Sequence, residues 1–96
     1  MKVQTSLEAD EDLIAIFLQG LAQFGLEQAN TYHAELQASF ELLARFPRMG
    51  QEHRDIQSPV RIRPHRSHVI VYEETAGGVL ILRVRHGRED WFGDPL

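Results

Sequence analysis

Cysteine is absent from the chain, which excludes both a disulfide framework and a cysteine-ligated zinc site. Long apolar runs are missing too, since the longest, Leu13 to Leu18, is far shorter than the roughly 20 residues that span a bilayer. Residues 1–6 are too few and too polar for a signal peptide. We therefore expect a cytoplasmic protein with no membrane partner.

Recognisable catalytic motifs are also absent. The sequence has no G-x-S-x-G, no phosphate-cradling glycine loop and no dinucleotide fingerprint. Two of its five histidines, His65 and His68, are three residues apart, but no third ligand follows at a metal-binding spacing. We expect neither a metal nor a cofactor.

What the 96 residues do contain is an ordinary globular composition, 43% hydrophobic and 25% charged, which predicts one domain over residues 1–96. The net charge of −4 hides an asymmetry. Residues 1–53 carry three Lys/Arg against eight Asp/Glu, whereas residues 54–88 carry seven arginines against three acids. Arginine offers a planar fork for carboxylate or phosphate, so the second half favours an anionic partner.

Two amphipathic helices are predicted in the acidic half, as a hairpin over about residues 6–46. Thr5 or Ser6 can cap the first helix, Thr5 having capping-box spacing to Glu8, and Gly25 ends it. The second helix runs from 26 to about 46, where Pro47 stops it. The apolar stripes are Ala9, Leu13, Ile16, Phe17, Leu21 and Phe24 on the first helix, and Ala29, Tyr32, Leu36, Phe40, Leu43 and Phe46 on the second.

Because the connection at Gly25 is so short, the helices must fold back antiparallel with their stripes facing. Aromatic residues at helical spacing are mostly core, and we assign Phe17, Phe24, Tyr32 and Phe40 to packing.

A β-sheet is predicted at about 60–86, with strands at 60–63, 68–73 and, as the central strand, 79–85. A short strand at 2–5 opens the chain, and the composition predicts a loop at 47–59, a hairpin turn at 76–78 and an irregular tail at 87–96. The predicted fold class is therefore α+β: an N-terminal antiparallel helix hairpin packed on a small, mostly antiparallel sheet. We expect the stripes to pack on Val69, Val71, Ile81 and Val84.

The stretch Val79 to Trp91 joins the most apolar strand to the densest charge cluster, so a buried strand delivers cations to a rim. Arginines two apart on one strand share a face, which predicts four cations on one exposed sheet face, beside a histidine that titrates near neutrality. An alternative for Arg83, which we favour slightly, is an ion pair with Glu73, Asp90 or a helix acid. The predicted target-binding residues are Arg61, Arg63, Arg83, Arg85, His86, Arg88 and Trp91.

Several segments resemble the RelE/ParE toxin superfamily, the toxins of bacterial toxin-antitoxin pairs, in its ParE-like branch. They are A-D-E-D-L-I-A-I at residues 9–16, the A-x-x-Y-x-x-x-L-x-x-x-F-x-x-L-x-x-F-P series at 29–47, Gly50, V-R at 60–61, H-V-I-V-Y at 68–72 and I-L-R-V-R-H-G-R-E-D-W at 81–91. The resemblance implies a helix hairpin on an antiparallel sheet and an antitoxin whose C-terminal segment wraps the toxin.

The superfamily has two mechanisms, and the resemblance implies a choice between them. ParE-like members poison DNA gyrase, whereas RelE-like members are ribosome-dependent mRNA endonucleases, for which Arg63, Arg83, His86 and Arg88 would be the catalytic candidates. Lys2 is the sole lysine and no tyrosine follows Tyr72, so residues typical of RelE-like sites are missing.

We therefore interpret the chain as a non-enzymatic gyrase inhibitor that forms a toxin-antitoxin hetero-oligomer. The alternatives are the endonuclease, with the ribosome as partner, and a non-toxic antitoxin-binding remnant of the fold.

Overall fold

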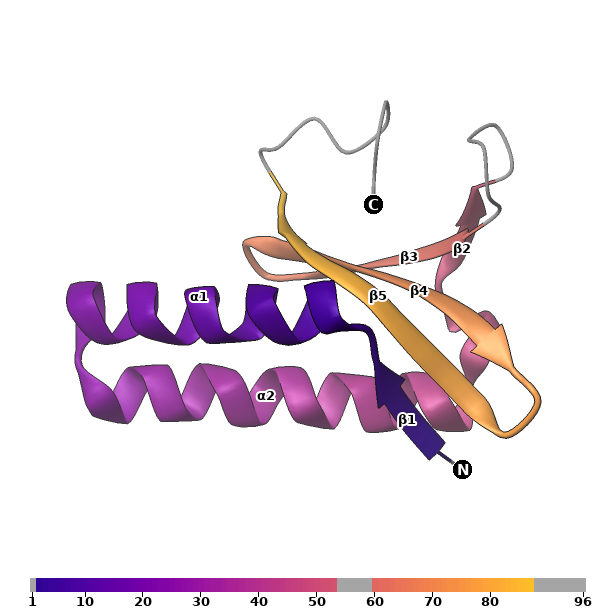
Figure 1. Cartoon of the computed structure of the whole chain (residues 1–96), viewed down its shortest axis with the longest axis horizontal. Coiled ribbons are helices and arrows are strands. Elements are labelled where there is room, and N and C mark those ends of the chain that lie inside the picture. Colours follow the sequence, from indigo (N-terminus) through magenta and orange to yellow (C-terminus); the bar gives the residue numbers. More distant parts are fainter. Residues whose placement is uncertain (1, 54–59, 88–96) are drawn as a thin grey trace.

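The computed structural model describes residues 2–53 and 60–87 of the chain. Two helices precede most of a five-stranded sheet (Figure 1). The elements are β1 (Lys2–Thr5), α1 (Leu7–Phe24), α2 (Leu26–Arg45), the 3-10 turn η1 (Pro47–Met49), β2 (Gln51–His53), β3 (Val60–His65), β4 (His68–Thr75) and β5 (Gly78–His86). The α+β prediction is confirmed.

The start of α1 is fixed by a side-chain cap. The Ser6 hydroxyl accepts a hydrogen bond from the Ala9 amide at 3.0 Å, which satisfies one of the free N–H groups of the first turn. The capping box expected at Thr5 and Glu8 is wrong, because the Thr5 hydroxyl donates instead to a carboxylate oxygen of Asp10 at 2.6 Å.

The hairpin corner is a single glycine, as predicted. Gly25 has φ +93°, a conformation that side chains disfavour, and its amide donates to the Leu21 carbonyl at 3.1 Å to close α1. The helix α2 begins at the next residue and ends at Arg45, just before Pro47, so the predicted helix limits are confirmed to within a residue or two.

The strand order is β1-β5-β4-β3-β2, with β1 parallel to β5 and all other pairs antiparallel. The centre of the sheet is therefore β4, not β5 as expected. The loop expected at 47–59 is wrong for Gln51–His53, which forms the edge strand β2. At Gly78 a Cβ would overlap the carbonyl oxygen of Lys2, so glycine there is required by the close approach of β1.

The two sheet faces hold different apolar clusters. On the helix side, residues of α1, α2 and the sheet pack into one core, and alternation along β4 places a second cluster on the opposite face. The first comprises Ala9, Leu13, Leu36, Phe40, Leu43, Ala44, Ile70, Tyr72, Val79, Ile81 and Val84; the second comprises Val60, Ile62, Val69 and Val71. The expectation that Val69 and Val71 pack against the helices is therefore wrong.

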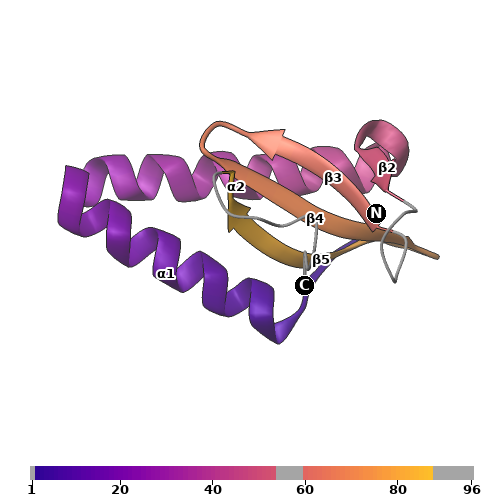
Figure 2. The same cartoon turned by 90° about the horizontal axis from the view of Figure 1, so that it is seen from above.

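The corner end of the hairpin extends past the sheet (Figures 1 and 2). Phe24, assigned to the buried stripe, lies near that end and is 65% exposed, because no strand covers it. Leu21, also assigned to the stripe, is 39% exposed. Phe46, beyond the last turn of α2, is likewise exposed. The periodicity identified the helices, but the sheet covers only part of their length.

Candidate functional site

The free edge of β5 beyond β1 is sealed by α1. Pairing with β1 stops at Ile81, and from there the Ser6 hydroxyl donates to the Leu82 carbonyl at 2.7 Å. One carboxylate oxygen of Asp12 then accepts from the Val84 amide at 3.0 Å and from Arg83 Nε at 2.7 Å. A hydrogen bond from Arg83 Nη2 to the other oxygen, at 2.9 Å, makes the ion pair bidentate. The slightly favoured alternative for Arg83, an ion pair with a helix acid, is confirmed.

The arginines predicted on one face lie on two. Arg61 and Arg63 pair across β4 with Tyr72 and Ile70, whereas Arg83 and Arg85 pair with Val71 and Val69. Directly paired residues project to the same side of a sheet, so the first two arginines share the helix side and the last two the opposite side. The expected four-cation surface is therefore wrong.

The β3 arginines differ in their surroundings. Arg61 is half-buried, and its Nη1 donates to the Gly50 carbonyl at 2.8 Å, which holds the connection before β2. Its Nη2 also lies 4.0 Å from a carboxylate oxygen of Glu52. Arg63 is exposed, while Arg85 on β5 is half-buried.

Two further predicted site residues, Arg88 and Trp91, lie outside the described residues. The target-binding roles of all seven residues stay predictions.

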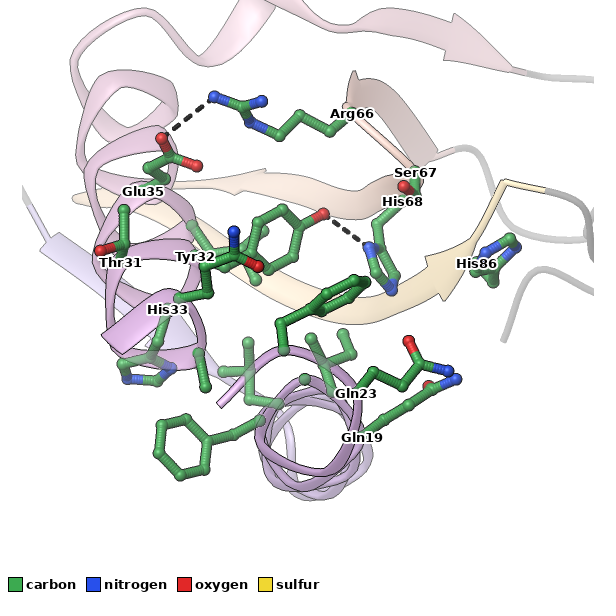
Figure 3. Close-up of a pocket in the computed structure, with 18 of the residues that line it drawn as sticks. Gln19, Gln23, Thr31, Tyr32, His33, Glu35, Arg66, Ser67, His68 and His86 are labelled. Carbon is green, nitrogen blue, oxygen red and sulfur yellow. Dashed lines mark hydrogen bonds and ion pairs between the residues drawn. The ribbon is translucent and has the colours of Figure 1, made fainter. Parts of the chain in front are cut away.

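A groove of about 760 Å³ lies between the helix hairpin and the edge of the sheet where β4 begins, at His68, and β5 ends, at His86 (Figure 3). Its apolar part comes from the helices, including Phe17, Leu36 and Phe24. The polar lining comes from both layers, and His86 is the one predicted site residue among it. The groove is lined on the polar side by Gln19, Gln23, Glu27, Gln28, Thr31, Tyr32, His33, Glu35, Arg66, Ser67, His68 and His86.

A tyrosine-histidine network forms one wall of this groove. The Tyr32 hydroxyl lies 2.6 Å from His68 Nδ1 (Figure 3). It also lies 3.4 Å from the His65 carbonyl oxygen. The His68 ring in turn lies 5.4 Å, between centroids, from that of His86, with which it is paired across the sheet. The hydroxyl thus has an acceptor in either tautomer of His68.

Burial shifts the pKa values of two side chains in this part of the groove, Tyr32 and His65. Desolvation raises the pKa of Tyr32 above its ordinary value, so its hydroxyl stays protonated and acts as a donor. Desolvation also lowers the pKa of His65, with opposing smaller effects of Glu35, which raises it, and Arg66, which lowers it. His65 Nδ1 lies 2.9 Å from the Ser39 hydroxyl, while its Nε2 is buried with no partner among the described residues, which favours the neutral ring.

The hairpin turn between β3 and β4 closes the groove at this side. Arg66 has φ +53°, which is uncommon for a residue other than glycine, and its guanidinium lies 3.1 Å from a Glu35 carboxylate oxygen (Figure 3). This pair joins the turn to α2. It is solvent-exposed, so it adds little stability and instead sets charge at the groove rim.

Chemically, the groove suits the binding of an amphipathic segment better than catalysis. It offers an apolar floor with amides, a phenol and imidazoles around it. Among residues 2–53 and 60–87, no three His, Asp or Glu side chains are grouped so as to hold a metal ion. The nuclease candidates Arg63 and Arg83 lie on opposite sides of the sheet and do not converge.

Sequence reasoning missed this network because each of its members fits a more ordinary role. Tyr32 belongs to the apolar stripe of its helix, and the spacing of His65 and His68 points first to metal ligands. The available signal was the two-residue turn between them, which places His65 and His68 directly opposite each other in a hairpin.

Comparisons with known proteins agree on one family. The family described as "ParE toxin of type II toxin-antitoxin system, parDE" matches residues 3–91. Toxin ParE1 of Caulobacter vibrioides is 37% identical over 81 residues, which cover 84% of this chain and 83% of that protein. The structure titled "Chromosomal ParDE TA system from P. aeruginosa" matches with a TM-score of 0.74 and 20% identity over 90% of this chain and 95% of that one, which shows a shared fold. No helix within the described residues is long and apolar enough to cross a membrane.

Proposed function

Because the chain belongs to the family of ParE toxins of type II toxin-antitoxin systems, we propose that it arrests growth by inhibiting DNA gyrase and that a cognate antitoxin neutralises it. The match over residues 3–91 carries the proposal, since it spans both helices and all described strands except the first residue of β1. Gyrase acts on chromosomal DNA, so the toxin acts in the cytoplasm.

Chemical arguments support protein binding over RNA cleavage. Ribonucleolytic cleavage needs a group that takes the 2′-hydroxyl proton and another that protonates the leaving oxygen. Arginine is protonated at any ordinary pH and makes a poor base, and Arg83 is already held by Asp12. Of the four nuclease candidates, His86 alone is suited to proton transfer. An inhibitor that binds gyrase needs only an anchoring surface, for which arginine and tryptophan are favoured.

The groove supports an antitoxin partner. An amphipathic segment can place apolar side chains against Phe17 and Phe24 while its polar groups meet the rim of Tyr32, Glu35 and Arg66. Binding there covers apolar surface at the hairpin end that the sheet leaves open. The product is a toxin-antitoxin hetero-oligomer.

The function is tested with purified toxin in two assays. We expect it to block gyrase supercoiling or trap cleaved DNA, and to leave messenger RNA on ribosomes intact. Two variants sharpen the test: His86→Gln should keep most of the growth arrest, because no proton transfer is needed, and Trp91→Ala should remove it. Circular dichroism of both variants checks that they fold.

Two results would overturn the proposal. Ribosome-dependent cleavage that is lost in His86→Gln would establish the endonuclease instead. A protein that binds its antitoxin but leaves gyrase, ribosomes and growth unaffected would be a non-toxic remnant of the fold.

A further inference from the structure

Arg66 holds a backbone conformation that does not suit an arginine. It is the first of the two residues that join β3 to β4, since His65 pairs directly with His68. Its φ is +53°, and within residues 2–53 and 60–87 it is the one residue other than glycine with a positive φ. A positive φ at this position of a two-residue hairpin favours glycine, because a Cβ there crowds the following backbone. The turn itself would therefore be more stable with glycine at position 66.

The contacts of Arg66 within the protein do not explain why an arginine occupies this position. Its Nη2 donates to Glu35 Oε2 at 3.1 Å, and the two side chains are 64% and 36% exposed. An ion pair this exposed adds little to stability. It also uses one of the five N–H donors of the guanidinium, and the part of the chain that the structure describes provides no second hydrogen bond. A strained residue whose side chain contributes so little to folding points to a role in binding.

Arg66 stands on the sheet wall of the groove. The lining residues of this wall are Arg66, Ser67, His68 and His86. None of them is acidic, because the two acids of the lining, Glu27 and Glu35, both come from α2. Figure 3 shows the Arg66 side chain reaching from the turn toward Glu35. The one permanent positive charge of the groove therefore lies at its rim, on the side opposite the helices.

We propose that Arg66 is a binding residue of the groove and that its guanidinium takes an aspartate or glutamate side chain of the antitoxin segment seated there. The inference rests on the proposed function, because the antitoxin is the occupant. Glu35 holds the guanidinium at the rim, and the remaining donors of the planar fork meet the two oxygens of the incoming carboxylate. Since the bound segment shields this new pair from water, the new pair is stronger than the exposed pair with Glu35.

Charge complementarity selects an acid at this point of the segment. A basic side chain would bring a second cation against Arg66, which raises the free energy of the complex. An apolar side chain would cover the guanidinium while leaving its donors without acceptors, which is also unfavourable. A carboxylate avoids both costs, because it supplies a negative charge and two acceptor oxygens.

Two measurements on Arg66→Gly separate binding from folding, because the expected effects have opposite directions. Its melting temperature should equal or exceed that of the parent, since glycine adopts a positive φ freely. Its dissociation constant for the full-length cognate antitoxin, from calorimetric titration, should rise at least about tenfold, as on removal of an arginine anchor from other interfaces. A lower melting temperature with parental affinity would make Arg66 a structural residue and overturn the proposal.

The matched control for charge is Arg45, an exposed arginine in the last turn of α2 that does not line the groove. Arg45→Gln and Arg66→Gln change the net charge equally, so any general attraction to the antitoxin falls alike in both. We expect Arg45→Gln to bind within about twofold of the parent and Arg66→Gln to lose at least about tenfold. Equal losses would show an effect of net charge instead of a contact and would refute the inference.

A double-mutant cycle identifies the carboxylate. Each acid of the antitoxin is replaced in turn by its amide, and each antitoxin variant is titrated into the parent and into Arg66→Gln. One replacement should weaken binding to the parent about tenfold but add little to the loss in Arg66→Gln, because the pair is already broken there. If every replacement acted alike on both toxins, no acid would pair with Arg66 and the inference would fail.

The outcomes also separate this inference from the proposed function. A parent toxin that binds no antitoxin would end the proposed neutralisation and the role of Arg66 together. Equal affinities of the parent and Arg66→Gln would end the role of Arg66 alone. An Arg66→Gln toxin that keeps its antitoxin affinity but no longer inhibits gyrase would assign the arginine to the gyrase-binding surface, which likewise overturns the inference.

Discussion

Asp12 and Arg83 form a bidentate ion pair between the second turn of α1 and the middle of β5, with N–O distances of 2.7 and 2.9 Å. The two residues are 71 positions apart, and both side chains are mostly buried. The same carboxylate also accepts a hydrogen bond from the Val84 amide. It therefore satisfies the edge of β5 beyond the last residue that pairs with β1. Arg83, one of the predicted target-binding residues, therefore joins the helix layer to the sheet.

Asp12→Asn tests this role in stability. The variant keeps one acceptor oxygen but loses the charge, so we expect the free energy of unfolding to fall by about 2 kcal/mol. The matched control is Glu8→Gln, an exposed acid one turn earlier, which should cost no more than about 0.5 kcal/mol. Urea denaturation measures both, and equal effects would show that the pair contributes nothing beyond helix-end electrostatics.

The chain before β2 gives a second prediction. The Tyr72 hydroxyl is buried, accepts from the Gly50 amide at 2.8 Å and donates to the Pro47 carbonyl at 2.7 Å. A Cβ at Gly50 would overlap that hydroxyl, so Gly50→Ala should cost about 1–3 kcal/mol.

The control is Gly77→Ala, where a Cβ would meet nothing within 4 Å and the melting temperature should change little. If both substitutions lowered the melting temperature equally, overlap with Tyr72 could not be the reason for the destabilisation by Gly50→Ala.

His65 gives the stability of the toxin a pH dependence. Burial lowers its pKa in the folded state, so below its ordinary value near 6.5 the unfolded chain binds a proton that the folded protein resists. The contribution of neutral His65 to the free energy of unfolding is therefore fully present above pH 6.5. It is lost as the pH falls toward the lower pKa of His65 in the folded protein.

We therefore expect the free energy of unfolding to decline from pH 7 to pH 5 less steeply in His65→Gln than in the parent. His33→Gln, which replaces an exposed histidine of α2, is the control and should keep the parental slope. Identical slopes for all three proteins would exclude His65 as a source of the decline.

Local signals predicted most of the fold, because they act through the chain itself. Gly25 and Pro47 end their helices for backbone reasons that need no tertiary context, and the β-branched runs identified β3, β4 and β5. β2 escaped detection because Gln51–His53 has no apolar alternation and joins the sheet at its edge, by pairing with β3. The exposed end of the first apolar stripe was also unpredictable, since it depends on where the sheet stops.

The side of the sheet on which each arginine lies depends on the pairing register of the strands, which could not be predicted from the sequence. The register of β5 shifts between Val71 and Tyr72 of β4, so that Tyr72 pairs with Ile81 while Val71 pairs with Arg83. Such an irregularity changes which side chains share a face, and only the assembled sheet defines it. The groove likewise arises from elements distant in sequence, α1, α2, β4 and β5, so residue spacing could not predict its tyrosine-histidine wall.

The groove itself yields the last prediction, which rests on the proposed antitoxin. Phe24 lines the groove and is 65% exposed, so an apolar segment seated there should cover its ring. Phe24→Ala should then weaken antitoxin binding at least about tenfold, as loss of a central aromatic contact does at other interfaces. Leu18→Ala, which removes a similarly exposed side chain outside the groove, should leave the affinity unchanged.

Calorimetric titration of each toxin variant with antitoxin measures these affinities, and the parent complex should melt well above free toxin because binding favours the folded state. A Phe24→Ala toxin that binds as tightly as the parent would place the antitoxin elsewhere on the surface, while a Leu18→Ala toxin that binds more weakly would place it across the side of α1 that carries Leu18.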